Sequence, residues 1–192
     1  SAAVATARTA FATWSKTPLK ERISHLKRGQ RWLIDNIDNV AQVISTNNGK
    51  PRVESLMADV APVIQTINYY ADEAENILAP EKISIGRWLP TKVAYMSYSP
   101  LGVIGIISPW NYPFSIPMAE IVASLVAGNC VVIKPSEVTS LVNQEIKKFI
   151  EACGLPNGVF TMLEGDGLTG AALSSSKVDR IIFTGSVPTG IK

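Results

Sequence analysis

Residues 102–137 read GVIGIISPWNYPFSIPMAEIVASLVAGNCVVIKPSE, and this stretch decides the fold. An apolar run at 102–107 is followed by a polar turn and by a helical pattern at 116–127, which Gly128 and Asn129 end. A second apolar run rich in β-branched residues occupies 130–133. Short strands that are apolar throughout are typical of a parallel sheet covered on both faces. The stretch therefore predicts a strand, a crossover helix and a parallel strand.

The same alternation continues toward the carboxyl terminus. We expect a helix at 139–152, a strand at 159–163, a helix at 168–174 and a strand at 180–183. Strands that alternate with helices predict an α/β fold with a doubly wound, Rossmann-like parallel sheet of the nucleotide-binding type. We assign residues 100–192 to this α/β domain.

Residues 1–81 carry a helical period almost throughout and form an amino-terminal helical segment. Thr17 is expected to cap the second helix, with Pro18 at its first helical position. A third helix opens near Asn36 and ends in the run NNGKP at 47–51. Apolar residues from 53 to 77 then fall on one stripe of a long helix, which Pro62 is expected to kink.

Residues 82–99 change to a period of two, which predicts a β-hairpin or a pair of edge strands. The alternating residues lie around Gly86 and Pro90; they are Ile83, Ile85, Trp88, Val93 and Tyr95. Exposed strand edges with aromatic side chains invite pairing with another chain. We therefore expect an oligomerisation hairpin, covered by a second copy in a homodimer or homotetramer.

Composition excludes several classes of protein. Of 192 residues, 46% are hydrophobic, and 18 Lys and Arg balance 16 Asp and Glu, which leaves no basic stripe for nucleic acid. Cys130, Cys153 and the single histidine, His25, lack metal-ligand spacing, so no metal site is expected. The most apolar window, 121–133, is shorter than the ~20 residues of a membrane span.

Two further expectations come from the ends of the chain and from its cysteines. The chain begins without Met and stops after a strand and a turn, so we expect it to be a piece of a longer protein. It opens with no signal peptide and holds no disulfide framework, which makes a cytoplasmic location the default expectation.

Ligands of open α/β sheets bind beyond the carboxyl ends of the strands, so the turns that follow the strands deserve most weight. Here these turns occupy 108–113, 134–137, 164–167 and 184–186. Lys134 and Glu137 are the leading candidates because an ammonium and a carboxylate at this edge can both bond ribose hydroxyls, while the carboxylate would repel a 2′-phosphate. The alternative is a surface ion pair between them.

A glycine pattern at 165–170, GDGLTG, fits G-x-G-x-x-G between a strand and a helix. The acidic residue expected ~20 positions further on is missing, since Asp179 follows too soon. A tight turn with close helix packing is at least as good an explanation as pyrophosphate binding.

Four motifs, taken in order, resemble the aldehyde dehydrogenase superfamily. They are PWNYP at 109–113, KPSE at 134–137, EACGLPNGV at 151–159 and FTGS at 183–186. The resemblance extends over nearly the whole chain but only over the amino-terminal part of a typical member. The glutamate of the E-L-G-G-K type motif and the nucleophilic cysteine that follows it are not among these residues.

The resemblance implies an NAD-dependent oxidation of an aldehyde to a carboxylic acid through a cysteine thiohemiacetal, with NADP the less expected cofactor. By this resemblance, Asn111 is the catalytic residue whose side-chain amide donates a hydrogen bond to the oxyanion. Cofactor contacts carry over to three groups. They are the cleft residues Ile107, Ser108, Pro109 and Trp110; the ribose and adenine residues Lys134, Ser136, Glu137, Gly167 and Gly170; and the pyrophosphate turn Phe183, Thr184, Gly185 and Ser186.

Three other interpretations stay open or are disfavoured. Cys130 and Cys153 match no nucleophile position of the family and are expected to be small core or cap residues. A catalytically inert cofactor-binding or assembly module of this length is the rival function. An ordinary Rossmann dehydrogenase of alcohols or hydroxy acids is disfavoured by the missing acidic residue and by the pair Trp110 and Asn111.

Overall fold

The computed structural model describes residues 2–86 and 91–191. Its centre is a four-stranded parallel sheet in the order β5-β4-β3-β6. The strands are β3 (Val103–Ile107), β4 (Cys130–Lys134), β5 (Phe160–Met162) and β6 (Arg180–Phe183). The two central strands, β3 and β4, are almost wholly buried, as their continuous apolar sequence predicts. The α/β fold with a parallel sheet is thereby confirmed.

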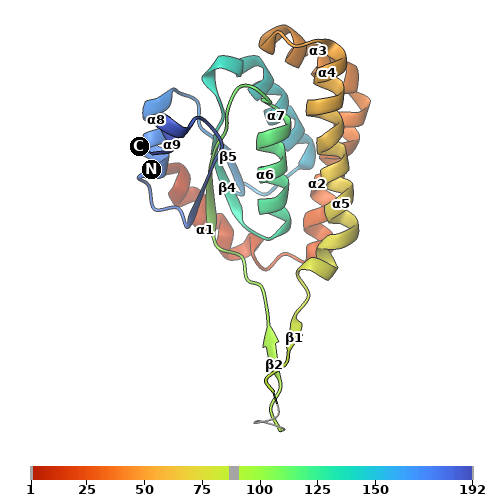
Figure 1. Ribbon diagram of the computed structural model, residues 1–192, viewed down its shortest axis with the longest axis vertical. Helices are drawn as coiled ribbons and strands as arrows, with labels where there is room; N and C mark the ends of the chain where they lie inside the picture. Colours follow the sequence, from red (N-terminus) through yellow and green to blue (C-terminus); the bar gives the residue numbers. More distant parts are fainter. Residues whose placement is uncertain (1, 87–90, 192) are drawn as a thin grey trace.

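Helices cover both faces of this sheet, which gives the doubly wound arrangement (Figure 1). On one face lie α1 (Ala2–Trp14) and α8 (Gly167–Ser174), and on the other lie α6 (Ser115–Val126) and α7 (Ser140–Cys153). The first helix therefore packs against the sheet itself, and its Val4, Ala7 and Trp14 are buried there. Phe11, which lies between Ala7 and Trp14 in the sequence of this helix, is partly buried.

An outer layer of helices packs on α6 and α7. It consists of α2 (Leu19–Asp35), α3 (Ile37–Asn48) and α5 (Ala61–Ile77). The predicted cap of α2 was wrong: the Thr17 hydroxyl donates to the carbonyl oxygen of Thr13 instead, and Pro18 takes the N-cap position. The end of α3 is as predicted, because Gly49 adopts a left-handed conformation with φ 84° just after it.

The long helix is interrupted by a π-helical turn. Its parts are α4 (Arg52–Glu54), the turn η1 (Ser55–Val60) and α5. Proline has no N–H to bond the carbonyl four residues before it, and the wider turn that ends just before Pro62 accommodates this loss. The turn also shifts the helical phase, so Val53 and Met57 are 68% and 65% exposed. The prediction that one apolar stripe runs from residue 53 to residue 77 was therefore wrong.

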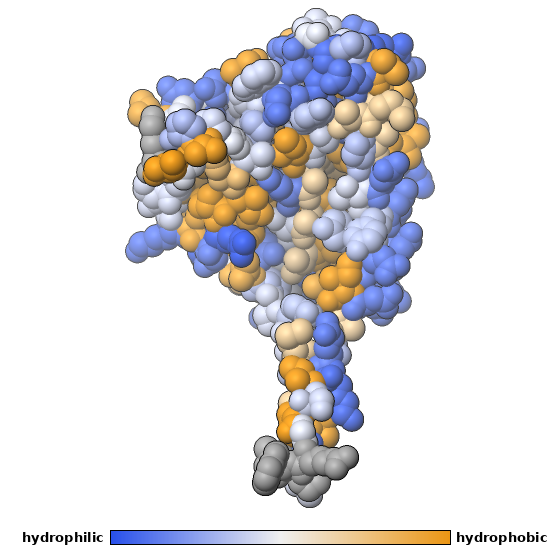
Figure 2. All heavy atoms as spheres, viewed as in Figure 1, coloured by the Kyte–Doolittle hydropathy of each residue, from blue (hydrophilic) through white to orange (hydrophobic). Residues whose placement is uncertain are grey.

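A short antiparallel hairpin projects from the body of the molecule (Figure 1). Strands β1 (Glu81–Ile83) and β2 (Ala94–Met96) pair with Ile83 opposite Ala94. Figure 2 shows apolar side chains along this arm, and Ile83, Val93 and Tyr95 are exposed. The predicted contributions of Trp88 and Pro90 lie outside the described residues.

The described residues contain neither a membrane-spanning helix nor a metal-binding cluster. Within 2–86 and 91–191, no helix has the length and apolar character needed to cross a bilayer. Over the same ranges, no three His, Cys, Asp or Glu side chains gather in a way that could hold a metal ion.

Candidate functional site

The carboxyl edge of the sheet brings three of the predicted turns together. Ile107, the last residue of β3, stands opposite Lys134 of β4 and opposite Phe183 of β6. The turns that follow these strands are tied to each other through the backbone. The N–H of Ser108 donates to the carbonyl oxygen of Lys134 at 3.4 Å, and the N–H of Thr184 donates to that of Ile107 at 3.0 Å.

Lys134 and Glu137 form an ion pair at this edge, with 2.6 Å between Nζ and Oε2. The lysine side chain is 7% exposed and the glutamate side chain 50%. The hydrogen bond from Lys134 holds the pKa of Glu137 below its ordinary value. The pair expected under the alternative interpretation therefore exists, but at the strand end where ligands of this fold bind.

Ser136 shapes the turn between these two residues. It is buried, its Oγ accepts a hydrogen bond from the N–H of Val138 at 3.3 Å, and its carbonyl oxygen accepts one from Asn143 Nδ2 at 3.0 Å. The Ser136 hydroxyl thus bonds the backbone of its own turn. The structure gives Ser136 a supporting part at the site.

The glycine pattern at 165–170 opens α8. Asp166 caps this helix by accepting from the N–H of Leu168 at 2.9 Å. Gly165 has φ 143°, and a Cβ there would lie 2.0 Å from Thr169 Oγ1, so the turn itself requires glycine. Gly167 faces open space, whereas a Cβ on Gly170 would lie 3.8 Å from Lys134 Cδ. The close-packed turn thus accounts for Gly165, whereas a Cβ on Gly170 would make only ordinary van der Waals contact with Lys134.

Asp179, the first acidic residue after that pattern, lies at the opposite edge of the sheet. It immediately precedes β6, forms an ion pair with Arg8 and accepts a hydrogen bond from the N–H of Val103 at 2.6 Å. This carboxylate joins α1 to the start of the sheet. It does not reach the carboxyl edge.

The turn at 108–113 carries Trp110 and Asn111 at the surface. Trp110 is 54% exposed, and Asn111 is exposed as well. Among the described residues no hydrogen bond is formed by the side-chain amide of Asn111, so the amide does not bond the turn backbone. Beneath the turn, the Ser108 hydroxyl is buried without a hydrogen-bond partner in the described part of the chain.

Sequence reasoning missed the residues that hold this turn. Lys50 Nζ donates to the carbonyl oxygen of Asn111 at 2.7 Å, and Asn48 Nδ2 donates to that of Trp110 at 2.7 Å. Lys50 also pairs with Asp59, at 2.7 Å between Nζ and Oδ2. One signal was available: Asp59 is an acidic residue between Leu56 and Val60 on a stripe expected to be buried.

The turn after β6 contains a second feature that was missed. Thr184 Oγ1 donates to Glu120 Oε1 at 3.0 Å, while Glu120 Oε2 is buried without a partner among the described residues. Burial raises the pKa of Glu120 above its ordinary value, and the hydrogen bond from Thr184 opposes that shift. The available signal was a lone carboxylate in the apolar helix pattern at 116–127.

Gly185 and Ser186 complete the turn after β6. A Cβ on Gly185 would lie 2.6 Å from the Phe183 ring, so that ring occupies the space beside the turn. Ser186 precedes α9 (Val187–Gly190), and its Oγ lies 2.8 Å from Thr189 Oγ1. All four predicted residues of the FTGS motif thus lie at the carboxyl edge.

The two cysteines lie away from this edge. Cys130 is the first residue of β4 and Cys153 the last of α7, and both are fully buried. Burial raises the pKa of each thiol to about 12. The interpretation of both as core residues fits this placement.

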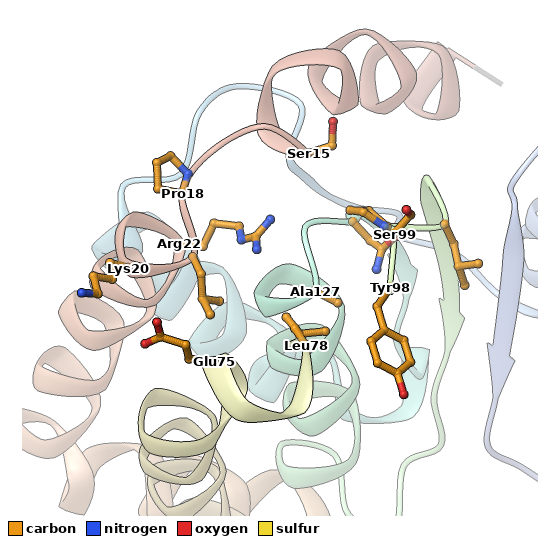
Figure 3. A pocket seen from close by; sticks show the side chains of 13 residues that line it. Ser15, Pro18, Lys20, Arg22, Glu75, Leu78, Tyr98, Ser99 and Ala127 are labelled. Atoms are coloured by element: carbon orange, nitrogen blue, oxygen red, sulfur yellow. The ribbon is translucent and has the colours of Figure 1, made fainter. Parts of the chain in front are cut away.

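A cavity of about 690 Å³ lies at the other end of the sheet. It is lined by residues that precede β3 and β4, such as Leu101 and Asn129, together with the end of α5 (Figure 3). Arg22 points into it and is 8% exposed. Because ligands of this fold bind at carboxyl edges, the cavity is separate from the site of the predicted residues.

A model of the aldehyde dehydrogenase family matches residues 1–192. The chain belongs to the aldehyde dehydrogenase family. Over 184 residues it is 36% identical to the 4,4'-diapolycopene aldehyde oxidase of Methylomonas sp, covering 95% of this chain and 35% of that protein. It is 32% identical to aminoaldehyde dehydrogenase 2 of Solanum lycopersicum, covering 93% of this chain and 36% of the relative.

A solved structure extends the similarity to three dimensions. An aldehyde dehydrogenase from Bacillus cereus, determined in complex with NAD⁺, superposes with a TM-score of 0.90 at 31% identity. The match covers 99% of this chain and 39% of that one. The chain thus spans a little over a third of the length of each of these three relatives.

Proposed function

We propose that this chain supplies the cofactor-binding part of an NAD-dependent aldehyde dehydrogenase that oxidises an aldehyde to a carboxylic acid. One observation carries the proposal: the Lys134–Glu137 pair and the turn that bears Asn111 follow adjacent strands at one edge of the sheet. The family membership of the chain supports it, and so does the NAD⁺ complex of the relative from Bacillus cereus.

The residues at this edge fit the adenosine ribose of NAD. Glu137 is half exposed and its carboxylate is ionised, so it can accept hydrogen bonds from two vicinal hydroxyls. Lys134 stands beside it as a donor, and Gly170 packs next to the Lys134 side chain, with 3.8 Å between an added Cβ and Lys134 Cδ. We assign the pyrophosphate to the turn of Thr184, Gly185 and Ser186, which follows the neighbouring strand β6, and the nicotinamide end to the side of Ile107 and Trp110.

Asn111 is the catalytic residue that this chain contributes. Its amide is exposed and is not used by the surrounding turn, so it can donate to a carbonyl oxygen of the substrate. Such a donor stabilises the negative charge that develops when a nucleophile attacks the aldehyde carbon. NAD, when bound, accepts the hydride that leaves this carbon.

The nucleophilic thiol and the base that activates water are assigned to residues outside this chain. Cys130 and Cys153 are buried, and their pKa is raised to about 12, which leaves them without thiolate character. In the proposed enzyme a thiolate from the remaining part of the protein would form the thiohemiacetal. The substrate class is an aldehyde.

The proposal is tested by aldehyde-dependent NADH formation. The longer protein that contains this chain should reduce NAD⁺ when hexanal or benzaldehyde is added, whereas the 192-residue chain alone should not. An inert module would leave both inactive. Turnover by the chain alone, lost on replacing Cys130 or Cys153, would overturn the assignment of the nucleophile to another part of the protein.

We also propose that the hairpin β1–β2 forms the contact between copies of the protein. Its strands are only three residues long and leave Ile83, Val93 and Tyr95 exposed, at 45%, 56% and 64%. A two-stranded hairpin of this length is marginal in water by itself. Pairing with a second copy would bury these side chains.

A further inference from the structure

A buried ion pair lies beneath the turn that carries Asn111. Lys50 Nζ and Asp59 Oδ2 are 2.7 Å apart, and their side chains are 7% and 0% exposed. The pair joins the segment after α3 to the π-helical turn η1. Burying two charges costs about as much desolvation free energy as their attraction returns. Stability alone therefore does not account for two charged residues at this place.

Both charged groups hold backbone atoms of the turn. Lys50 Nζ donates to the carbonyl oxygen of Asn111 at 2.7 Å. Asp59 Oδ1 accepts from the N–H groups of Phe114 at 3.2 Å and Ser115 at 3.0 Å. Hydrogen bonds to ionised groups are stronger than neutral ones. The pair thus fixes the backbone before and after residue 113.

The Asn111 side chain stays outside this network. Its backbone oxygen is bound by Lys50, while its amide forms no hydrogen bond with any residue in the described part of the chain. A preorganised donor is effective only if it is already aimed at the place where charge develops, and a displacement of about 1 Å can cost a hundredfold in rate. The direction of this amide depends on the backbone that Lys50 and Asp59 hold.

We infer that Lys50 and Asp59 are positioning residues for the Asn111 amide. They contact neither substrate nor cofactor and act by holding the backbone from which the amide projects. The inference rests on the proposed function, because it takes Asn111 as the donor to the oxyanion. It explains why a lysine and an aspartate are buried under an exposed turn.

The test is a double-mutant cycle in the longer enzyme, read by single-turnover NADH formation with hexanal as the probe aldehyde. Asn111→Ala should slow this step about a hundred- to a thousandfold. Lys50→Met should slow it about tenfold or more, with NAD⁺ affinity changed less than twofold. The combined variant should be no slower than Asn111→Ala alone, since Lys50 acts only through Asn111.

Two further variants separate positioning from folding. Lys50→Met leaves the Asp59 carboxylate buried without its cation, which destabilises the protein. The variant Lys50→Met with Asp59→Asn removes both charges, and it should keep the fold while the chemical step stays slow. Arg52→Met is the matched control: it breaks an ion pair with Asp38 whose side chains are 54% and 80% exposed, and it should react at the original rate.

The outcomes distinguish this inference from the proposed function. Suppose that Lys50→Met, and the double variant Lys50→Met with Asp59→Asn, both react at the wild-type rate. This result would contradict the positioning role and leave the oxyanion role of Asn111 intact. If the rate losses of Lys50→Met and Asn111→Ala multiply when the two substitutions are combined, the positioning role is also contradicted, because Lys50 would then act independently of Asn111. An unchanged rate in Asn111→Ala would overturn the oxyanion role itself and the positioning role with it.

Discussion

Lys134 Nζ lies 2.6 Å from Glu137 Oε2 at the end of β4. The lysine side chain is buried, whereas the glutamate side chain is half exposed. The buried ammonium thus fixes the direction of a carboxylate that faces solvent. Its hydrogen bond lowers the pKa of Glu137. A glutamate is ionised at neutral pH even at its ordinary pKa, and the lysine stabilises that ionised form. An ionised carboxylate in a fixed position accepts hydrogen bonds from ribose hydroxyls and repels a phosphate.

The first prediction concerns cofactor preference. Glu137→Thr in the longer enzyme should lower the ratio of kcat/KM for NAD to that for NADP by about tenfold or more, because it removes the charge that would face the 2′-phosphate. Steady-state kinetics with both cofactors measure this ratio. Asp38→Asn, which removes the exposed carboxylate paired with Arg52, should leave it unchanged. The ribose assignment fails if the two variants behave alike.

The second prediction concerns the thiols. Cys130 and Cys153 are fully buried and their pKa is raised to about 12, so neither should react with a disulfide reagent in the folded protein. Both should react once guanidinium unfolds it. Mass spectrometry of the labelled peptides identifies each cysteine. Rapid labelling of either one in the native state would show a reactive thiol that the structure does not provide.

The third prediction concerns the stability of the protein as a function of pH. Burial raises the pKa of Glu120 in the folded state, so this carboxyl favours folding at low pH, and the contribution is lost as the pH rises from the unfolded pKa through the folded one. Glu120→Gln should therefore gain stability relative to the original protein as the pH rises through this window. The Gln oxygen can still accept from Thr184.

Denaturant unfolding of both proteins at several pH values measures the effect. Glu151→Gln, a change on the exposed side of α7, provides the control and should follow the original protein. Identical pH profiles for Glu120→Gln and the original protein would exclude Glu120 as the source of the dependence.

Local pattern was enough to predict the central sheet. The runs at 102–107 and 130–133 are apolar on both faces, and the structure places them as β3 and β4 in the middle of the sheet. The polar turns that follow parallel strands must then meet at one edge. This rule located Lys134, Glu137, Asn111 and Thr184 without any knowledge of the tertiary structure.

The supporting contacts could not be predicted in the same way. Lys50 and Asn111 are 61 positions apart and Asp59 and Phe114 are 55 apart, so no local spacing connects them. The π-helical turn η1 changes the helical phase, and a regular period therefore misplaces Val53 and Met57. Asp59 is the exception that the sequence does mark, because a carboxylate on a buried stripe requires partners.

The fourth prediction concerns self-association. Tyr95→Glu places a charge on the exposed hairpin and should shift the protein toward monomers, because a charge buried at an interface between copies is costly. Sedimentation velocity over a range of concentrations measures the shift. Tyr69→Glu is the matched control, since Tyr69 is 55% exposed on α5 and away from the hairpin. The hairpin is not the contact if both variants retain the oligomer.

The fifth prediction concerns where NAD⁺ binds, as seen in a crystal structure of the longer protein with NAD⁺ bound. We predict that the adenosine ribose hydroxyls bond Glu137 and Lys134, that the pyrophosphate lies at the turn of Thr184 and Gly185, and that the nicotinamide end lies beside Asn111. NAD⁺ bound elsewhere, as in the cavity around Arg22 at the opposite end of the sheet, would contradict it.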